Sequence, residues 1–199
     1  MSMPGVHDES EACAGAGTRA SQTLIVLRGN SGSGKSSVAA EIRRLYRNRD
    51  LAVIPQDVVR RQMLRDRDVP GAANIDLIDT IARWSLGHGY HVLLEGILYS
   101  DRYGSMIRSL VADHSGPSLL YYMDIPFAET LRRHATKPNA HEFGEPEMAQ
   151  WYRERDLLPG RHETVIGPDQ PLRGTVEQIM RDAGLSSAPE ATSRRSGSR

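Results

Sequence analysis

The stretch Gly29-Asn30-Ser31-Gly32-Ser33-Gly34-Lys35-Ser36 decides how the rest of this sequence is interpreted. It matches the pattern G-x-x-x-x-G-K-[ST], in which glycines let consecutive backbone N–H groups curl around one anion. The apolar residues 24–27 before it predict a buried strand, and residues 37–46 after it predict a helix. Because a strand, a glycine-rich turn and a helix are the context that a phosphate-binding P-loop requires, the sequence predicts one here.

Lys35 and Ser36 give this segment its predicted chemistry. Lys35 is expected to reach the β- and γ-phosphates of a nucleotide, and the Ser36 hydroxyl is expected to ligate Mg²⁺. The start of the following helix adds the positive end of its dipole. Since the chain has only two lysines, a chance lysine at this point of the pattern would be rare. The residues predicted to bind the nucleotide here are Gly29, Asn30, Ser31, Gly32, Ser33, Gly34, Lys35, Ser36 and Ser37.

Length, charge and cysteine content narrow the class of protein. The 199 residues suit one domain, and 25 basic against 25 acidic residues give no formal net charge. This balance argues against a general nucleic-acid coat or a membrane-surface protein, although a local basic cleft is compatible with it. Cys13 is the single cysteine, so no intramolecular disulfide can form. The sequence lacks a signal-peptide core and any apolar run of membrane-spanning length, so we expect a cytoplasmic protein with no membrane partner.

The ends of the chain differ in composition from its middle. Residues 1–21 are small and polar, and residues 186–199 are rich in Ser and Arg. Both are therefore predicted to be disordered tails. The folded unit is predicted to be a single domain at residues 22–185.

Strand and helix patterns alternate within the folded unit. Strands are predicted at residues 23–28, 51–54, 91–94, 118–123 and 164–166. Helices are predicted at residues 35–48, 57–65, 74–87, 100–113, 126–136, 145–155 and 171–183. This alternation predicts an α/β fold in which a parallel sheet has helices on both faces. Because ligands bind beyond the carboxyl ends of such strands, the candidate site residues are the P-loop, Gln56-Asp57, Glu95-Gly96 and Asp124.

Asp57 is the first candidate catalytic residue. It follows the second predicted strand, and Arg60 comes one helical turn later. A carboxylate beside the last phosphate of a nucleotide could accept the proton of a substrate hydroxyl. Arg60 or Arg61 could hold an anionic group of the substrate, or the transferring phosphoryl group, with its planar guanidinium. The alternative is structural, with Asp57 capping the helix and Arg60 pairing with a surface acid, and capping is compatible with catalysis.

Glu95 is the candidate metal-site residue that accompanies Ser36. Three apolar residues precede it on a strand that is expected to lie beside the P-loop strand. An acid in this position orients Mg²⁺ through water, although the usual residue there is Asp. Gly96 would allow a ligand to approach closely. The alternatives are that Glu95 binds the substrate or is an ordinary acid at a strand exit.

A basic group follows the fourth predicted strand. Phosphoryl transfer spreads negative charge over the phosphate oxygens, so an arginine clamp on a mobile lid is useful. Residues 136–144 contain the proline and glycine expected of such a lid. Arg133 is predicted to be catalytic and Arg132 to bind the nucleotide, with Lys137, Arg153 and Arg155 as further lid candidates.

The histidines and tryptophans are interpreted as packing or surface residues. No metal-ligand spacing relates the histidines His88, His91, His134, His141 and His162. Trp84 and Trp151 lie on predicted helices, where stacking on a base or an aromatic substrate is the alternative to packing.

These motifs together resemble those of the small P-loop kinases, within the AAA-type P-loop NTP-binding family. The chain is similar to the polynucleotide-kinase-like, zeta-toxin-like and chloramphenicol-phosphotransferase-like groups, with shikimate and gluconate kinases nearby. The resemblance rests on the P-loop, Asp57-x-x-Arg60, Glu95-Gly96 and the run of residues 122–133. It implies a P-loop NTPase fold with a five-stranded parallel sheet of order 2-3-1-4-5, a small lid, and ATP with Mg²⁺ as donor. It also implies that Asp57 activates the acceptor hydroxyl and that Arg132 or Arg133 is the lid arginine.

The leading functional hypothesis is an ATP-dependent kinase that transfers the γ-phosphate to a hydroxyl of a small molecule. A nucleotide, a sugar derivative or an antibiotic would all fit as acceptor. A nucleic-acid 5′-end kinase is less favoured, since it needs a basic groove. A nucleotide switch or regulatory ATPase is the contrasting hypothesis, but Asp57 would be surplus to it. No N-K-x-D guanine motif is present, so adenine is preferred as the base, and the acceptor and oligomeric state stay open.

Overall fold

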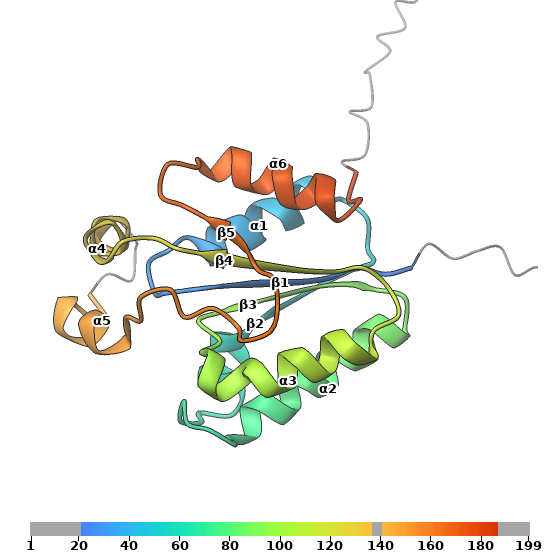
Figure 1. Cartoon of the computed structure of the whole chain (residues 1–199), viewed down its shortest axis with the longest axis horizontal. Helices are drawn as coiled ribbons and strands as arrows, with labels where there is room; N and C mark the ends of the chain where they lie inside the picture. The colour runs from blue at the N-terminus through green and yellow to red at the C-terminus, as the bar shows by residue number, and fades with distance from the viewer. Residues whose placement is uncertain (1–20, 137–140, 187–199) are drawn as a thin grey trace, which may run out of the picture.

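The computed structural model of the chain describes residues 21–136 and 141–186 (Figure 1). Most of the two predicted tails lies outside these residues, as do Cys13 and Lys137. The described residues form one sheet in which all neighbouring strands are parallel, in the order β2-β3-β1-β4-β5. Its strands are β1 (Leu24–Gly29), β2 (Leu51–Pro55), β3 (His91–Gly96), β4 (Ser118–Met123) and β5 (Thr164–Ile166). The predicted fold class and strand order are therefore confirmed.

Helices cover both faces of the sheet, because each pair of successive parallel strands is joined by a helical crossover. In Figure 1, α1 and α6 lie on one face, α2 and α3 lie on the other, and α4 and α5 lie beyond the carboxyl ends of the strands. The helices are α1 (Lys35–Leu45), η1 (Val58–Met63), α2 (Ala73–Gly87), α3 (Ser100–Asp113), α4 (Phe127–Ala135), α5 (Glu145–Trp151) and α6 (Leu172–Asp182). Within the described residues, no helix is both long and apolar enough for a bilayer crossing.

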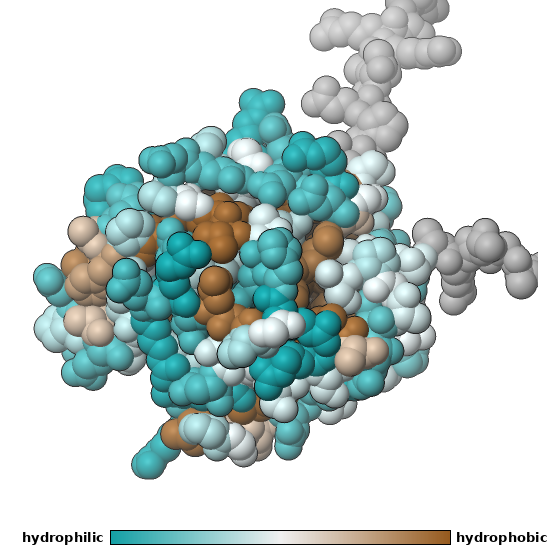
Figure 2. Space-filling model, viewed as in Figure 1, coloured by the Kyte–Doolittle hydropathy of each residue, from teal (hydrophilic) through white to brown (hydrophobic). Residues whose placement is uncertain are grey.

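The central strand β1 supplies side chains to two separate hydrophobic cores. Ile25 and Leu27 pack in the core that also contains residues of α1 and α6. Leu24 and Val26 pack in the core that contains residues of α2 and α3. All four side chains are fully buried, and each contributes on the order of 1.5–3 kcal/mol through burial. Polar side chains cover the outer face of α6 (Figure 2), so this helix is amphipathic. The strand that leads into the P-loop is thus buried under helices on both faces of the sheet.

Arg28 is a charged residue near the end of this buried strand, and its side chain is 0 % exposed. Its guanidinium donates two hydrogen bonds to the Glu163 carboxylate, at 2.9 and 3.0 Å, and one to Asp156 at 3.1 Å. Its Nε donates to the Leu98 carbonyl at 2.9 Å. A buried guanidinium is tolerated when its charge and its donors all have partners. Arg28 therefore ties the chain around residues 156–163 to the end of β1.

Two predicted helices differ from the structure near the start of the domain. The helix predicted at 35–48 ends at Leu45, where the following residue is extended. The segment predicted as a helix at 57–65 is a π-helix, η1, at Val58–Met63. Asp57 stands at the cap position of η1, but its side chain makes no capping hydrogen bond and instead accepts one from Arg60 at 2.9 Å.

The helix predicted at 145–155 is also too long, since α5 ends at Trp151. The backbone N–H of Arg153 donates to Asn30 Oδ1 at 2.9 Å, and the Arg153 carbonyl accepts from Asn30 Nδ2 at 2.7 Å. These two bonds use the backbone of Arg153 in a contact with the P-loop. The tertiary contact therefore replaces the helical turn that local sequence favours.

Replacing Arg28 with alanine should leave the buried Glu163 carboxylate and the partly buried Asp156 carboxylate without their cation. Because removing one partner of a buried ion pair costs about 3–5 kcal/mol, we expect the free energy of unfolding to fall by about that amount. Urea denaturation followed by circular dichroism at pH 7 measures this change. Arg173→Ala is the matched control, since Arg173 is 89 % exposed and its pair with Glu177 should contribute about 0.5 kcal/mol or less. Equal stabilities for the two variants would contradict the assigned role.

Candidate functional site

The P-loop follows β1, and its backbone favours glycine at three of its positions. Gly29, Gly32 and Gly34 have positive φ angles of 142°, 78° and 106°. A Cβ on Gly32 would lie 2.5 Å from the Thr130 carbonyl oxygen, and one on Gly29 would lie 2.7 Å from that of Met123. The loop is thus packed directly against the end of β4 and against α4, and a side chain at either position would force it open.

Lys35 lies inside the curl of this loop and is 6 % exposed. Its Nζ donates hydrogen bonds to the Asn30 carbonyl at 2.8 Å and to Ser33 Oγ at 3.2 Å. The ammonium therefore bridges the two sides of the loop at the N-terminus of α1. Backbone N–H groups, a helix N-terminus and a cation meet at this point, which is the arrangement that binds phosphate.

Glu95 lies beside the P-loop, because its strand β3 pairs directly with β1, as expected from the sequence. Leu27 of β1 is in register with Glu95 of β3, and the Glu95 side chain is largely buried. Ser36 Oγ donates a hydrogen bond to Glu95 Oε2 at 3.3 Å. A hydroxyl and a carboxylate are hard oxygen ligands of the kind that Mg²⁺ prefers, so this pair fits a magnesium ion shared with bound phosphates.

Arg133 and Arg132, which are adjacent on α4, lie differently with respect to the loop. Arg133 Nη1 donates to the Ser33 carbonyl at 2.9 Å, so this guanidinium contacts the P-loop. Arg132 is 71 % exposed, and its hydrogen bonds to Glu129, both 2.7 Å long, stay within α4. Arg133 Nε also donates to Glu129, at 2.6 Å. The structure thus brings Arg133, but not Arg132, against the phosphate loop.

A cavity of about 460 Å³ adjoins the P-loop, and Ser31 of the loop is part of its wall. Asp57 and Arg60 line it from the start of η1, and their ion pair is 2.9 Å long. The Asp57 side chain is 61 % exposed, so its carboxylate is open to a ligand. The cavity has the size of a small-molecule site, and it places a carboxylate beside the phosphate loop.

Tyr99 forms the part of the cavity wall that organises two further arginines. Arg153 and Arg102 lie over its ring, with Cζ 4.1 and 4.6 Å from the ring centroid. Burial raises the pKa of the Tyr99 hydroxyl, which therefore stays neutral and donates to the Trp151 carbonyl at 2.5 Å. Cation–π contacts of this kind hold guanidinium groups in place without neutralising their charge.

A buried hydroxyl network supports the same wall. The Tyr103 hydroxyl accepts a hydrogen bond from Gln56 Nε2 at 2.7 Å and lies 2.8 Å from Asn74 Oδ1 and 3.0 Å from Asp68 Oδ1. Burial raises the pKa of Tyr103, so its hydroxyl keeps its proton. Asp68 in turn pairs with Arg102 at 3.0 Å. The network thereby connects the end of β2 to the basic side of the cavity.

Several residues of this site escape the sequence analysis, for different reasons. Tyr99 follows the end of β3 and could have been found by extending the strand-end rule by a few residues. Arg28 stands out as a charge in an apolar run, which signals a buried ion pair but not its partners. Asp68 and Arg102 carry no local signal, because only the tertiary fold brings the loop after η1 to α3.

The remaining predicted residues lie around the site. Trp151 lines the cavity, with its ring centroid 5.0 Å from that of Phe143. Arg155 pairs with Asp124 at 3.7 Å, beyond the end of β4. Trp84 is 58 % exposed and lies outside the cavity, stacked on His88 with ring centroids 3.9 Å apart. Part of the predicted lid, including Lys137, falls outside the described residues.

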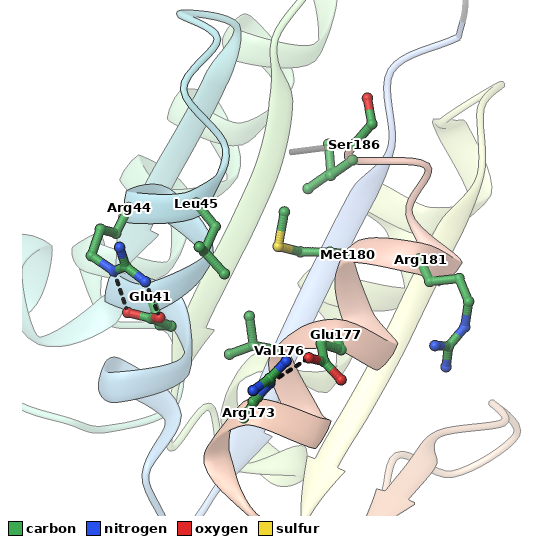
Figure 3. A pocket seen from close by; sticks show the side chains of 10 residues that line it. Glu41, Arg44, Leu45, Arg173, Val176, Glu177, Met180, Arg181 and Ser186 are labelled. Carbon is green, nitrogen blue, oxygen red and sulfur yellow. Dashed lines mark hydrogen bonds and ion pairs between the residues drawn. The ribbon is translucent and has the colours of Figure 1, made fainter. Parts of the chain in front are cut away.

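A second cavity, of about 620 Å³, lies between the later half of α1 and the length of α6 (Figure 3). Leu45, Val176 and Met180 point into it, and the ion pairs drawn at its rim each join two residues of the same helix. Leu45 is ten residues along α1 from Lys35, or about 15 Å at the helical rise. This cavity is therefore separate from the phosphate site.

Comparisons with known proteins agree with this geometry. The model of an AAA domain family matches residues 24–158, which is more than half of the chain. The chain belongs to this family. Among curated proteins, none matches the chain.

Solved structures with the same fold include kinases. The Mycobacterium tuberculosis APS kinase CysC, in complex with AMPPNP and APS, has a TM-score of 0.60 and 20% identity, covering 84% of this chain and 99% of that one. A gluconokinase from Sinorhizobium meliloti 1021 has a TM-score of 0.54 and 16% identity, covering 83% and 96%. The Deinococcus radiodurans tunicamycin resistance protein has a TM-score of 0.54 and 16% identity, covering 84% and 99%. At these identities the likeness establishes the P-loop NTPase fold, and it confirms the resemblance to small P-loop kinases.

Glu129 offers a pH test of the arginine arrangement on α4. Hydrogen bonds from Arg132 and then Arg133 lower the pKa of its carboxyl from 4.5 to about 2. The stabilisation from these ion pairs should therefore be fully present above pH 4.5 and be lost only as the pH falls toward about 2. An NMR titration of the Glu129 carboxyl carbon checks this midpoint. Replacing both arginines with glutamine should return it toward 4.5, and a midpoint near 4.5 in the unaltered protein would refute the arrangement.

Proposed function

We propose that the protein is a kinase that transfers the γ-phosphate of ATP to a hydroxyl of a small-molecule acceptor. The observation that carries this proposal is the cavity of about 460 Å³, which is lined by Ser31 of the P-loop and also by Asp57. A second substrate could occupy this volume with its hydroxyl near both the phosphate loop and a carboxylate. Membership of the AAA domain family and the kinases among the structural neighbours support the same function. We take residues 22–185 as the kinase domain and the cytoplasm as its location.

In the proposed reaction, the triphosphate lies along the curled N–H groups of the P-loop, with Lys35 at its β- and γ-phosphates. The acceptor oxygen forms a bond to the γ-phosphorus while the bond from that phosphorus to the β–γ bridging oxygen breaks and ADP leaves. Asp57 accepts the hydroxyl proton as general base. Arg60 holds Asp57 through their ion pair, and Arg133 supports the loop through its hydrogen bond to the Ser33 carbonyl. Arg132 is proposed to reach the nucleotide only after leaving Glu129.

The proposed magnesium site consists of the Ser36 hydroxyl and the Glu95 carboxylate. Their oxygens lie 3.3 Å apart at the start of α1 and suit a small hard cation. In the described residues, no cluster of three His, Cys, Asp or Glu side chains could hold a metal ion. Ser36 and Glu95 would therefore share the ion with nucleotide phosphates. When bound there, Mg²⁺ neutralises charge on the β- and γ-phosphates.

The alternative functions fit the site less well. A nucleic-acid 5′-end kinase would need an extended basic groove, whereas the cavity has a volume of about 460 Å³. A nucleotide switch would need neither this cavity nor the accessible Asp57 carboxylate. A small acceptor such as a nucleotide or a sugar derivative is therefore the preferred second substrate.

Lys35→Ala should abolish phosphoryl transfer and weaken ATP binding by at least about tenfold, since a charge-assisted contact with the phosphates is lost. Calorimetry with Mg²⁺ and ATP measures the affinity, and circular dichroism confirms that the fold survives. Arg44→Ala, on the exposed face of the same helix, is the matched control and should bind ATP as the unaltered protein does. Unchanged ATP affinity in Lys35→Ala would remove the P-loop from the proposal.

Asp57→Asn should bind ATP normally but transfer phosphate about 10²–10⁴-fold more slowly, because asparagine cannot accept the hydroxyl proton. The measurement is ADP release in the presence of an acceptor found by screening hydroxyl compounds. Asp76→Asn serves as control, since Asp76 is exposed on α2 and is not among the cavity residues. Equal turnover in both variants would exclude Asp57 as the base.

A further inference from the structure

The cavity beside the P-loop carries an excess of positive charge. Its basic residues are Arg60, Arg61, Arg102 and Arg153. Only Asp57 and Asp68 oppose them from its wall, and Asp101 pairs with Arg153 from outside the wall. This excess contrasts with the neutral charge of the whole chain. Four guanidinium groups around one cavity attract an anion, because their positive potentials add at its centre.

The ion pairs within the cavity leave one arginine uncompensated. Arg60 pairs with Asp57 at 2.9 Å, and Arg102 pairs with Asp68 at 3.0 Å. Arg153 pairs with Asp101 at 2.8 Å. Arg61, by contrast, makes no ion pair with any residue of the described ranges 21–136 and 141–186. Arg61 is also exposed, so its planar guanidinium is accessible to an anionic ligand in the cavity.

Two other arginines of the wall also retain unused donors. Within the described part of the chain, the Nε atoms of Arg60 and Arg102 are buried and have no hydrogen-bond partner. Arg102 Nε lies 4.0 Å from Asp101, which is too long for a hydrogen bond. Buried N–H groups are costly to leave without partners, so these two arginines keep donors that the described residues do not satisfy.

We propose that the acceptor carries an oxyanion group, phosphate or carboxylate, in addition to the hydroxyl that is phosphorylated, and that Arg61 binds this group. The proposal rests on the kinase function proposed above and names the class of its substrate. A neutral sugar or antibiotic would leave Arg61 without a partner and the excess charge unopposed. A hydroxyl compound that is already phosphorylated, such as a nucleotide or sugar phosphate, would pair with Arg61 and would also balance the excess positive charge of the cavity.

Trp151 provides a signal for ligands in this cavity, because its side chain is part of the wall. The chain has two tryptophans, and the other, Trp84, is 58 % exposed and outside the cavity. Replacing Trp84 with phenylalanine leaves Trp151 as the sole tryptophan. Changes in fluorescence then report on cavity occupancy rather than on events elsewhere in the protein.

The experiment compares acceptor analogues that differ only in the oxyanion. Full-length Trp84→Phe protein is saturated with AMPPNP and Mg²⁺, with binding verified by calorimetry, so that the P-loop is occupied. It is then titrated with three series: glycerol, glycerate and glycerol 3-phosphate; ribose and ribose 5-phosphate; and adenosine and AMP. The same titrations are made with two further variants in the Trp84→Phe background. One carries Arg61→Gln, and the other carries Arg67→Gln as control. Arg67 is exposed a few residues later in the chain and is not among the cavity residues.

In at least one series we expect the oxyanion compound to bind about tenfold or more tightly than its neutral partner. The Arg61→Gln change should remove most of that difference, and Arg67→Gln should keep it. Glycerate and glycerol 3-phosphate distinguish a carboxylate from a phosphate. Equal binding of neutral and anionic members in every series, or a full difference in Arg61→Gln, would overturn the proposal.

Failure of the kinase function gives a different result. If calorimetry detects no AMPPNP binding, or if no tightly bound compound stimulates ADP release from ATP, the proposed kinase function fails. The titrations repeated on nucleotide-free protein still decide whether the cavity prefers oxyanions through Arg61. Failure of the kinase function is therefore distinguishable from failure of the oxyanion proposal.

Discussion

The buried guanidinium of Arg28 is the constraint on which the arrangement of this molecule depends. It sits near the end of the central strand β1 and binds two carboxylates and a carbonyl from distant parts of the chain. The strand itself is held by apolar packing on both faces, whereas the segment 152–163 after α5 contributes only Leu158 to the buried core. An ion pair shielded from water supplies that anchor, because its partners cannot separate without exposing charges to a low-dielectric interior. As a result, Trp151 and Arg153 lie beside the P-loop.

Parallel pairing then concentrates the chemistry at one edge of the sheet. The carboxyl ends of β1, β2 and β3 lie together, so the P-loop, the start of η1 and Glu95 meet although they are far apart in sequence. The resulting site has two parts with distinct character. One is a loop of backbone N–H groups with Lys35 inside it, and the other is a cavity walled by arginines and aromatic rings. Ser31 belongs to both, so the parts are contiguous.

Much of this arrangement is predictable from sequence, because its signals are local. The apolar run before the P-loop, the glycine spacing and the alternation of strand and helix patterns give the sheet and the phosphate loop, and α3, β4 and β5 have the predicted bounds. The strand order followed from family resemblance rather than from spacing.

The prediction was wrong at the end of α5, where hydrogen bonds from Asn30 override local helix propensity. The pairing of Asp68 with Arg102 was not predictable, since loop and helix meet only through tertiary packing. The sequence could not distinguish Arg60 from Arg61 as the arginine that holds an anionic group, because only the structure shows that Arg60 pairs with Asp57.

Asn30 has a consequence for how kinetic data on this protein are interpreted. Its backbone belongs to the P-loop, while its side-chain amide both donates to and accepts from the backbone of Arg153 on the cavity wall. The residue therefore links the P-loop to the cavity wall through two hydrogen bonds. These two parts of the site are its half-sites. For the proposed kinase, a substitution of Asn30 is expected to displace both half-sites at once, so that the Michaelis constants for the proposed donor and acceptor shift together. Such a change would mimic substrate synergy in steady-state data even if each half-site, taken alone, kept its intrinsic affinity.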